Sequence, residues 1–226
     1  MKKILASLTI LSVLMFFTPN HAYAVATTWN SADKSADITL SGGDLTATQT
    51  NTGWHGVRGT TGKSSGLKYY EVTVTVVSEH LEGISNTTTS LDPAGNFASS
   101  GTGNVYYYAR HGEKSNGDGT EPAYGNAYVT GNVVSIAVNF DTGKIWAAIN
   151  GTWQNSGDPA AGTGEMFSGI SGTYYPFFGG DNIGNISVAN FGASAFAYTP
   201  PSGFSAWDAT AAAPSNFGTI TLFGDW

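Results

Sequence analysis

The chain has 226 residues, of which 41% are hydrophobic and 11% are charged, and its formal net charge is −7. This length suits one globular domain that buries roughly 70% of the surface of its unfolded chain. The acidic balance argues against a nucleic-acid partner, because phosphate binding needs clustered positive charge, and the absence of cysteine excludes disulfide bonds. Thirty glycines and the lack of an amphipathic helical run predict an all-β fold.

The first 24 residues are typical of an export signal. Lys2 and Lys3 precede an apolar stretch, residues 4–17, that is too short to span a bilayer, and residues 22–24 form an A-x-A cleavage signature. We expect a bacterial Sec substrate, cut after Ala24, that is periplasmic or extracellular and has no membrane span once the signal is removed. The alternative is an uncleaved anchor. No cysteine follows the apolar stretch, which excludes a lipoprotein anchor.

Strand signals follow one another through the rest of the chain. Alternating apolar and polar residues, bounded by Gly, Asn, Asp and Ser, predict half-buried strands. The expected strands are residues 36–40, 45–48, 54–60, 67–77, 80–85, 104–109, 133–140, 144–149, 174–178 and 186–191. Polar loops separate them, and the longest are residues 86–103 and 110–122.

The longest strand signal, residues 67–77, divides its side chains between two faces, because successive side chains of a strand point to opposite sides. The face expected in the core carries Tyr70, Val72, Val74 and Val76, and the other face carries Tyr69, Glu71, Thr73 and Thr75. By the same parity, Tyr106 and Tyr108 of the aromatic strand lie opposite Val105 and Tyr107.

Residues 131–153 form the centre of the expected sheet. The core side chains of their first strand are Val134, Ile136, Val138 and Phe140. The Asp-Thr-Gly sequence at residues 141–143 and the Asn-Gly pair at residues 150–151 are both turn signals, since Asp bonds its own backbone and Gly tolerates positive φ. Three antiparallel strands joined by two tight turns are therefore expected.

In their order along the chain, these motifs resemble the SPRY domain, the core of B30.2 modules. The matching segments are Trp29-Asn30 with Asp33-Lys34, residues 57–60 (VRGT), 64–66 (SSG), 69–72 (YYEV), 83–84 (GI), 123–127 (AYGNA), 131–135 (GNVVS), 141–143 (DTG), 150–151 (NG), 174–178 (YYPFF), 189–192 (ANFG) and 196–204 (FAYTPPSGF). The resemblance implies a β-sandwich of two packed antiparallel sheets, similar in shape to the concanavalin A-like jelly roll. We expect a signal peptide at residues 1–24, a SPRY-like domain at 25–207 and a tail at 208–226, in which residues 217–226 have the parity of one extra strand.

The resemblance also implies roles for particular residues. Glu71 stands at the characteristic strand glutamate of the family, and we expect it to form a structural pair with Arg58. In SPRY domains the partner binds loops clustered at one end of the sandwich, and residues 49–53, 85–91 and 179–182 correspond to three of these loops. The side chains expected to align a peptide backbone there are Asn51, Asn86, Thr88, Asp181 and Asn182.

No catalytic or metal motif is evident. Lectin-like glycanases place three acids on one strand as E-x-D-x-E, whereas residues 71–75 read Glu-Val-Thr-Val-Thr. His55, His80 and His111 stand on separate segments and are interpreted as surface or edge-strand residues. Residues 116–121 faintly resemble a calcium loop but lack EF-hand spacing, so a solvated loop is favoured. We expect no enzyme activity, no metal and no cofactor.

Two functions are consistent with the sequence. The resemblance implies a secreted, non-enzymatic module that binds a protein or peptide partner through its end loops. The alternative is a carbohydrate-binding protein, or a glycan-active enzyme on a related sandwich, with Tyr106, Tyr108 and Trp153 as candidate stacking residues. Aromatic residues on strands more often belong to the core.

Overall fold

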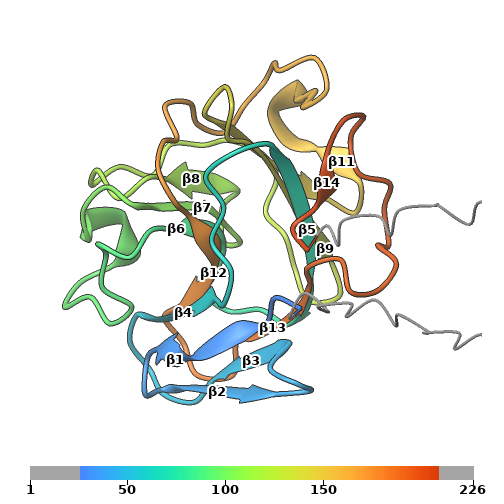
Figure 1. Cartoon of the computed structure of the whole chain (residues 1–226). Coiled ribbons are helices and arrows are strands. Elements are labelled where there is room, and N and C mark those ends of the chain that lie inside the picture. Colours follow the sequence, from blue (N-terminus) through green and yellow to red (C-terminus); the bar gives the residue numbers. More distant parts are fainter. Residues whose placement is uncertain (1–25, 209–226) are drawn as a thin grey trace, which may run out of the picture.

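The structure is a computed structural model that describes residues 26–208 and shows an all-β sandwich (Figure 1). The expected signal peptide and the expected extra strand at residues 217–226 lie outside the described residues. The strands are β1 Trp29–Lys34, β2 Ile38–Ser41, β3 Thr46–Gln49, β4 His55–Gly59, β5 Leu67–Val76, β6 His80–Ser85, β7 Asn104–Tyr108, β8 Glu113–Ser115, β9 Val133–Asn139, β10 Lys144–Ile149, β11 Thr152–Trp153, β12 Tyr175–Gly180, β13 Ile186–Asn190 and β14 Ser205–Ala206. Two short 3-10 turns, Phe97–Ser99 and Gln154–Ser156, are the helical elements of this part of the chain. Among residues 26–208, no helix has the length and apolarity needed to cross a membrane.

Two sheets make the sandwich. The six-stranded sheet has the order β1-β4-β12-β6-β7-β8, and the eight-stranded sheet has the order β11-β10-β9-β5-β13-β3-β2, with the short β14 parallel to β5. The other pairings are antiparallel, as the sequence predicts. The segment expected as a loop at residues 110–122 contains β8, whose three polar residues, Glu-Lys-Ser, give no alternation signal.

The core lies between the sheets. Tyr70, Val72 and Val74 of β5 are completely buried, in the same cluster as Ile84 and Phe178 of the opposite sheet, which confirms the expected parity of β5. The assignment of Val76 to the core is wrong: this side chain is 39% exposed. Between Val74 and Val76, β5 passes a register shift against β13, so the alternation of its two faces is interrupted before Val76.

The central meander forms as predicted. Residue Asn139 pairs with Lys144, and Ile149 pairs with Thr152. Both residues of the second turn, Asn150 (φ 47°) and Gly151 (φ 76°), have positive φ, which is the requirement of a type I′ hairpin turn. Val134, Ile136 and Val138 are fully buried, with Phe140 beside them, so this meander supplies one wall of the core.

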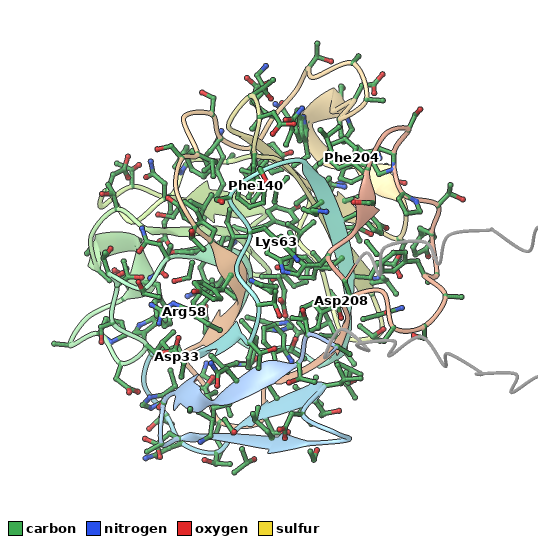
Figure 2. The ribbon with its side chains drawn as sticks, in the orientation of Figure 1. Asp33, Arg58, Lys63, Phe140, Phe204 and Asp208 are labelled. Atoms are coloured by element: carbon green, nitrogen blue, oxygen red, sulfur yellow. The ribbon has the colours of Figure 1, made fainter. Side chains whose placement is uncertain are left out.

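Arg58 and Glu71 do not form the expected pair, because they belong to different sheets. Arg58 lies on the outer face of the six-stranded sheet, and its Nη1 donates to Asp33 Oδ1 at 3.0 Å (Figure 2). Its Nε donates to Ser85 Oγ at 3.0 Å, and Nη2 donates to Thr89. Burial lowers the pKa of Arg58, and the Asp33 charge opposes that shift. Arg58 therefore fastens β1 and the start of the loop after β6 to the sheet.

Glu71 has an equivalent role on the outer face of the other sheet. Its carboxylate accepts hydrogen bonds from Tyr69 Oη at 2.7 Å and from the backbone N–H groups of Ala197, at 2.7 Å, and Tyr198, at 2.9 Å. The C-terminal segment that follows β13 is thereby held over Tyr69, Trp146 and Phe204, which form a separate hydrophobic cluster on this face.

Candidate functional site

Two of the three predicted recognition loops meet at one end of the sandwich. The predicted loop 49–53 begins at the last residue of β3. The predicted loop 179–182 begins with the last two residues of β12 and continues to residue 185. Gly53 N donates to Asp181 O at 2.7 Å. Buried Gln49 holds the first loop from below, since its Nε2 donates to Asn51 O at 3.0 Å and to Gly53 O at 2.6 Å. The two loops therefore form one rigid unit.

A third segment, residues 76–78, joins this unit. Asn182 Nδ2 donates to Ser78 Oγ at 3.0 Å, and buried Asn185 accepts from Ser78 N at 2.7 Å and donates to Asn182 O at 2.9 Å. On its other side, Val77 N donates to Thr130 Oγ1 at 3.0 Å. We call the surface formed by residues 49–53, 76–78, 129–132 and 181–185 the loop end.

Asn86 and Thr88 are not part of the loop end. In the six-stranded sheet His80 pairs with Gly180 and Ser85 pairs with Tyr175, so the loop after β6 leaves from the opposite end of the strand. Five residue steps of a strand correspond to roughly 16 Å. The expectation that all three loops share one end is therefore wrong for these two residues. At that opposite end, Asn86 Oδ1 accepts hydrogen bonds from Thr88 N at 3.0 Å and from Thr88 Oγ1 at 2.7 Å, and these bonds form a local turn.

The later part of the same loop returns to the loop end through His55. Nδ1 of His55 lies 2.7 Å from Asp92 Oδ1 and 3.1 Å from Ser35 Oγ, and Nε2 lies 3.1 Å from Thr52 O. Asp37 Oδ2 also lies 3.5 Å from Nε2, the nitrogen opposite Ser35, but Nε2 is closer to the Thr52 carbonyl and Nδ1 is closer to Asp92 than to Ser35. This is not the arrangement of a catalytic triad, in which the serine and the carboxylate are the hydrogen-bond partners of opposite ring nitrogens. His55 therefore has a structural role, because it joins the segments that carry Ser35, Thr52 and Asp92. Within residues 26–208, no group of three His, Cys, Asp or Glu residues is placed to hold a metal ion.

Exposed apolar side chains gather at the loop end. Among the described residues, the large hydrophobic side chains that are exposed are Ile183 (62%), Val129 (57%) and Val76 (39%). Each lies within or directly beside the hydrogen-bonded segments defined above, around residues 76–78. Apolar groups rimmed by polar residues are typical of a protein-interaction surface.

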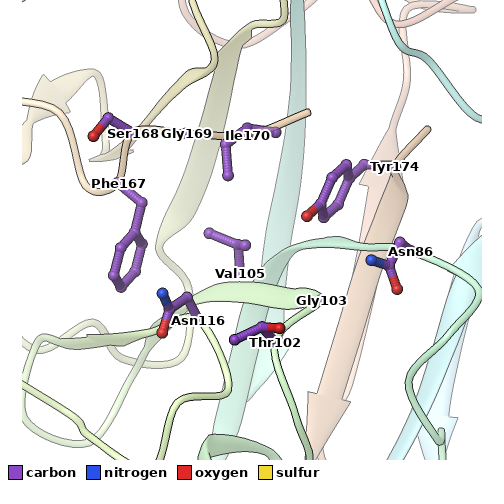
Figure 3. Close-up of a pocket in the computed structure, with 10 residues that line it drawn as sticks. All are labelled: Asn86, Thr102, Gly103, Val105, Asn116, Phe167, Ser168, Gly169, Ile170 and Tyr174. Carbon is purple, nitrogen blue, oxygen red and sulfur yellow. The ribbon is translucent and has the colours of Figure 1, made fainter. Parts of the chain in front are cut away.

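The opposite end holds a cavity of about 280 Å³ (Figure 3). It is bounded by Asn86, Thr102 and Asn116 on one side and by Phe167 and Tyr174 on the other, with Val105 at its base. Burial raises the pKa of the Tyr174 phenol, and a hydrogen bond from the Asn86 side chain opposes that rise. One predicted residue, Asn86, thus lines a hollow that the sequence did not indicate.

The calcium-loop and sugar-stacking candidates have other contacts in the structure. Asp118 Oδ1 accepts from Thr120 N at 2.9 Å and from Thr120 Oγ1 at 2.7 Å, and these bonds lower the pKa of Asp118. Tyr106 and Tyr108 are buried beneath the loop that contains Phe97, so they offer no exposed platform. Trp153 packs against Tyr69, with ring centroids 6.5 Å apart.

Comparison with known proteins agrees with this architecture. A scan against protein-family models and a search of curated protein sequences found no match. Among solved structures, the crystal structure of the SPRY domain of human HERC1 is similar, with a TM-score of 0.59 over 74% of this chain and 99% of that chain, at 15% sequence identity. The fold is that of a SPRY domain.

Within this SPRY sandwich, sequence reasoning missed a buried polar pair on β6. His80 Nε2 lies 3.0 Å from Glu82 Oε1, both side chains are completely buried, and Ser187 Oγ of the opposite sheet donates to Glu82 at 2.7 Å. His80 is thus neither a surface nor an edge-strand residue. The signal was available: His80 and Glu82 share strand parity with Ile84, a core residue.

Proposed function

We propose that this SPRY domain is a non-enzymatic module that binds a protein or peptide partner at its loop end. The observation that carries the proposal is the gathering of Val76, Val129 and Ile183 around loops that are already held by buried Gln49 and Asn185. Rigid loops with exposed apolar groups lose little conformational entropy when they bind a partner. SPRY domains are generally non-catalytic binding modules, which supports the same reading.

The loop end offers both parts of a protein-binding surface. Ile183 and Val129 supply apolar area, and Asn51, Asp181 and Asn182 supply hydrogen-bonding groups around it. An extended peptide needs both, because its backbone N–H and C=O groups must be satisfied when they lose water. Catalysis receives no support here, since the Glu71 carboxylate is occupied by the C-terminal segment and His55 is enclosed by structural partners.

Export is part of the proposal. The Lys2-Lys3 start, the apolar stretch and the A-x-A site support a protein that reaches the periplasm or the medium with Val25 as its first residue. N-terminal sequencing of the protein recovered from cells and medium tests this, and recovery of Met1 on exported material would contradict it.

Substitutions at the loop end are expected to weaken partner binding and leave folding intact. A partner is first captured by cross-linking to the full chain in the native envelope and medium. The Ile183→Asp variant is then expected to bind it at least tenfold more weakly, because a charge would be buried at the apolar centre. The double variant Asp181→Ala, Asn182→Ala is expected to lose part of the affinity. Titration calorimetry measures both.

The matched control is Ser41→Asp, which adds the same charge to an exposed position on the edge strand β2, at the end of that strand away from Gln49. It is expected to bind like the parent, and all variants are expected to melt within a few degrees of it. Unchanged affinity in Ile183→Asp and in the double variant would show that the partner does not bind at the loop end.

A further inference from the structure

The cavity at the end opposite the loop end is the starting observation, and it lies apart from the proposed partner surface. It opens where β6 ends and where β7 and β12 begin. Thr102, Ser168 and Gly169 of its lining are exposed, so solvent reaches it. Its volume of about 280 Å³ is close to the lower limit of roughly 300 Å³ for small-molecule pockets, which suits a ligand of one ring.

The charge of the lining selects the class of ligand. Its ten residues include no Asp, Glu, Lys, Arg or His. A charged ligand would lose water here without meeting a counter-charge, at a large cost in free energy. The cavity therefore favours a neutral ligand.

The polar groups of the lining offer both donors and acceptors. The Asn86 amide oxygen accepts two hydrogen bonds from Thr88, which leaves the amide N–H groups as donors beside Tyr174. The Asn116 side chain satisfies the Asp118 carboxylate when its amide is turned so that the nitrogen, not the oxygen, faces Asp118; the nitrogen then donates to Asp118 Oδ2 at 3.1 Å, which leaves the amide oxygen as an acceptor. Thr102 adds a hydroxyl at the mouth. A ligand that both donates and accepts at neighbouring atoms, as a set of vicinal hydroxyls does, matches this arrangement.

The remaining wall is apolar and fixed. The Lys114 ammonium lies 4.7 Å from the centroid of the Phe167 ring and donates to Met166 O, so the ring is held in place. Tyr174 and Ile170 are buried beside it. In Figure 3 Phe167 lies above Asn116 and Tyr174 lies above Asn86, with Val105 between the two pairs. The C–H face of a pyranose ring packs against such a wall while its hydroxyls reach the amides.

We propose that this cavity binds a single neutral sugar residue. The test is saturation-transfer NMR on the full chain with glucose, galactose and N-acetylglucosamine as separate probes. At least one sugar is expected to receive saturation. Its affinity is expected to fall about three- to tenfold in Phe167→Ala, because the stacking contact is lost, and to fall in Asn116→Leu, which removes an acceptor. Ser168→Trp is expected to abolish binding by filling the mouth.

The matched control is Asn126→Ala, which removes an exposed amide outside the cavity and is expected to bind as the parent does. The double variant Asp181→Ala, Asn182→Ala is also expected to retain sugar binding, so the result separates this site from the loop end. The proposal is overturned if none of the three sugars receives saturation, or if Ser168→Trp still binds the sugar. It is also overturned if a neutral asparagine amide displaces the sugar, because the cavity would then be a pocket for a peptide side chain.

Discussion

Replacing Glu82 with alanine is expected to lower the free energy of unfolding by about 3–5 kcal/mol, the usual loss when one member of a buried pair is removed. Glu82 has no exposed surface, and it lies 3.0 Å from His80 Nε2 and 2.7 Å from Ser187 Oγ. Without it, both groups are buried between the sheets with no partner, and a cavity is added. Urea denaturation followed by circular dichroism measures the change.

The same carboxyl predicts a dependence on pH. Burial raises the pKa of Glu82 above its ordinary value of 4.5, and His80 and Ser187 only partly oppose the shift. The folded state therefore holds the proton more tightly than the unfolded state. The stabilisation that results is complete below pH 4.5 and is lost as the pH rises through the folded-state pKa. The Glu82→Gln variant lacks this loss, so its stability relative to the parent is expected to increase as the pH is raised from 4.

Glu113→Ala provides the control for Glu82→Ala. Glu113 is half-buried on the edge strand β8, and its replacement is expected to change stability by no more than about 0.5 kcal/mol. If Glu82→Ala were as stable as this control, the buried pair would not be a source of stability. A stability difference between Glu82→Gln and the parent that stayed constant with pH would contradict the raised pKa.

Strand positions could be predicted because they depend on local patterns. The alternation in residues 67–77 and 133–140 is set by which side chains enter the core, and the Asn-Gly turn at residues 150–151 is set by φ. Strand alternation and turn conformation both depend on residues that are neighbours in the sequence. The strands around them accordingly appear within a few residues of their expected bounds.

Relations between sheets could not be predicted in the same way. Arg58 and Glu71 lie on neighbouring strands of the sequence, β4 and β5, which belong to opposite sheets, so proximity along the chain is misleading. Strand direction explains the loops as well. β6 and β12 are antiparallel neighbours, so the loops that follow them leave from opposite ends. Placing Asn86 and Asp181 on one surface would have required that pairing to be known.

The candidate site is a product of folding for the same reason. Val76, Val129 and Ile183 are isolated apolar residues in the sequence, and each alone reads as an ordinary loop or strand residue. They meet because Ser78 bonds to Asn182 and Asn185 while Val77 bonds to Thr130. Of the residues in this arrangement, the sequence indicated Asn182, because the resemblance to SPRY domains supplied its loop.

Replacing Tyr70 with alanine is the second change with a large expected effect, again about 3–5 kcal/mol of unfolding free energy. The Tyr70 side chain is completely buried, and its ring centroid lies 5.5 Å from that of Phe191 and 5.7 Å from that of Trp207. Its hydroxyl crosses the sandwich from β5 and donates to the Gly83 carbonyl on β6. Deletion therefore removes a large volume from the core and a hydrogen bond between the two sheets. Urea denaturation of the parent and the variant measures the loss.

Two variants separate these contributions. Tyr70→Phe keeps the ring and removes only the hydroxyl, so it is expected to cost about 1 kcal/mol, the value of one buried hydrogen bond. Thr73→Ala, at an exposed position of the same strand, is expected to remain within about 0.5 kcal/mol of the parent. Ile136→Ala, on the facing position of β9, is expected to cost about 2–5 kcal/mol by the same cavity argument. Equal stability in Tyr70→Ala and Thr73→Ala would contradict the placement of Tyr70 in the core between the two sheets.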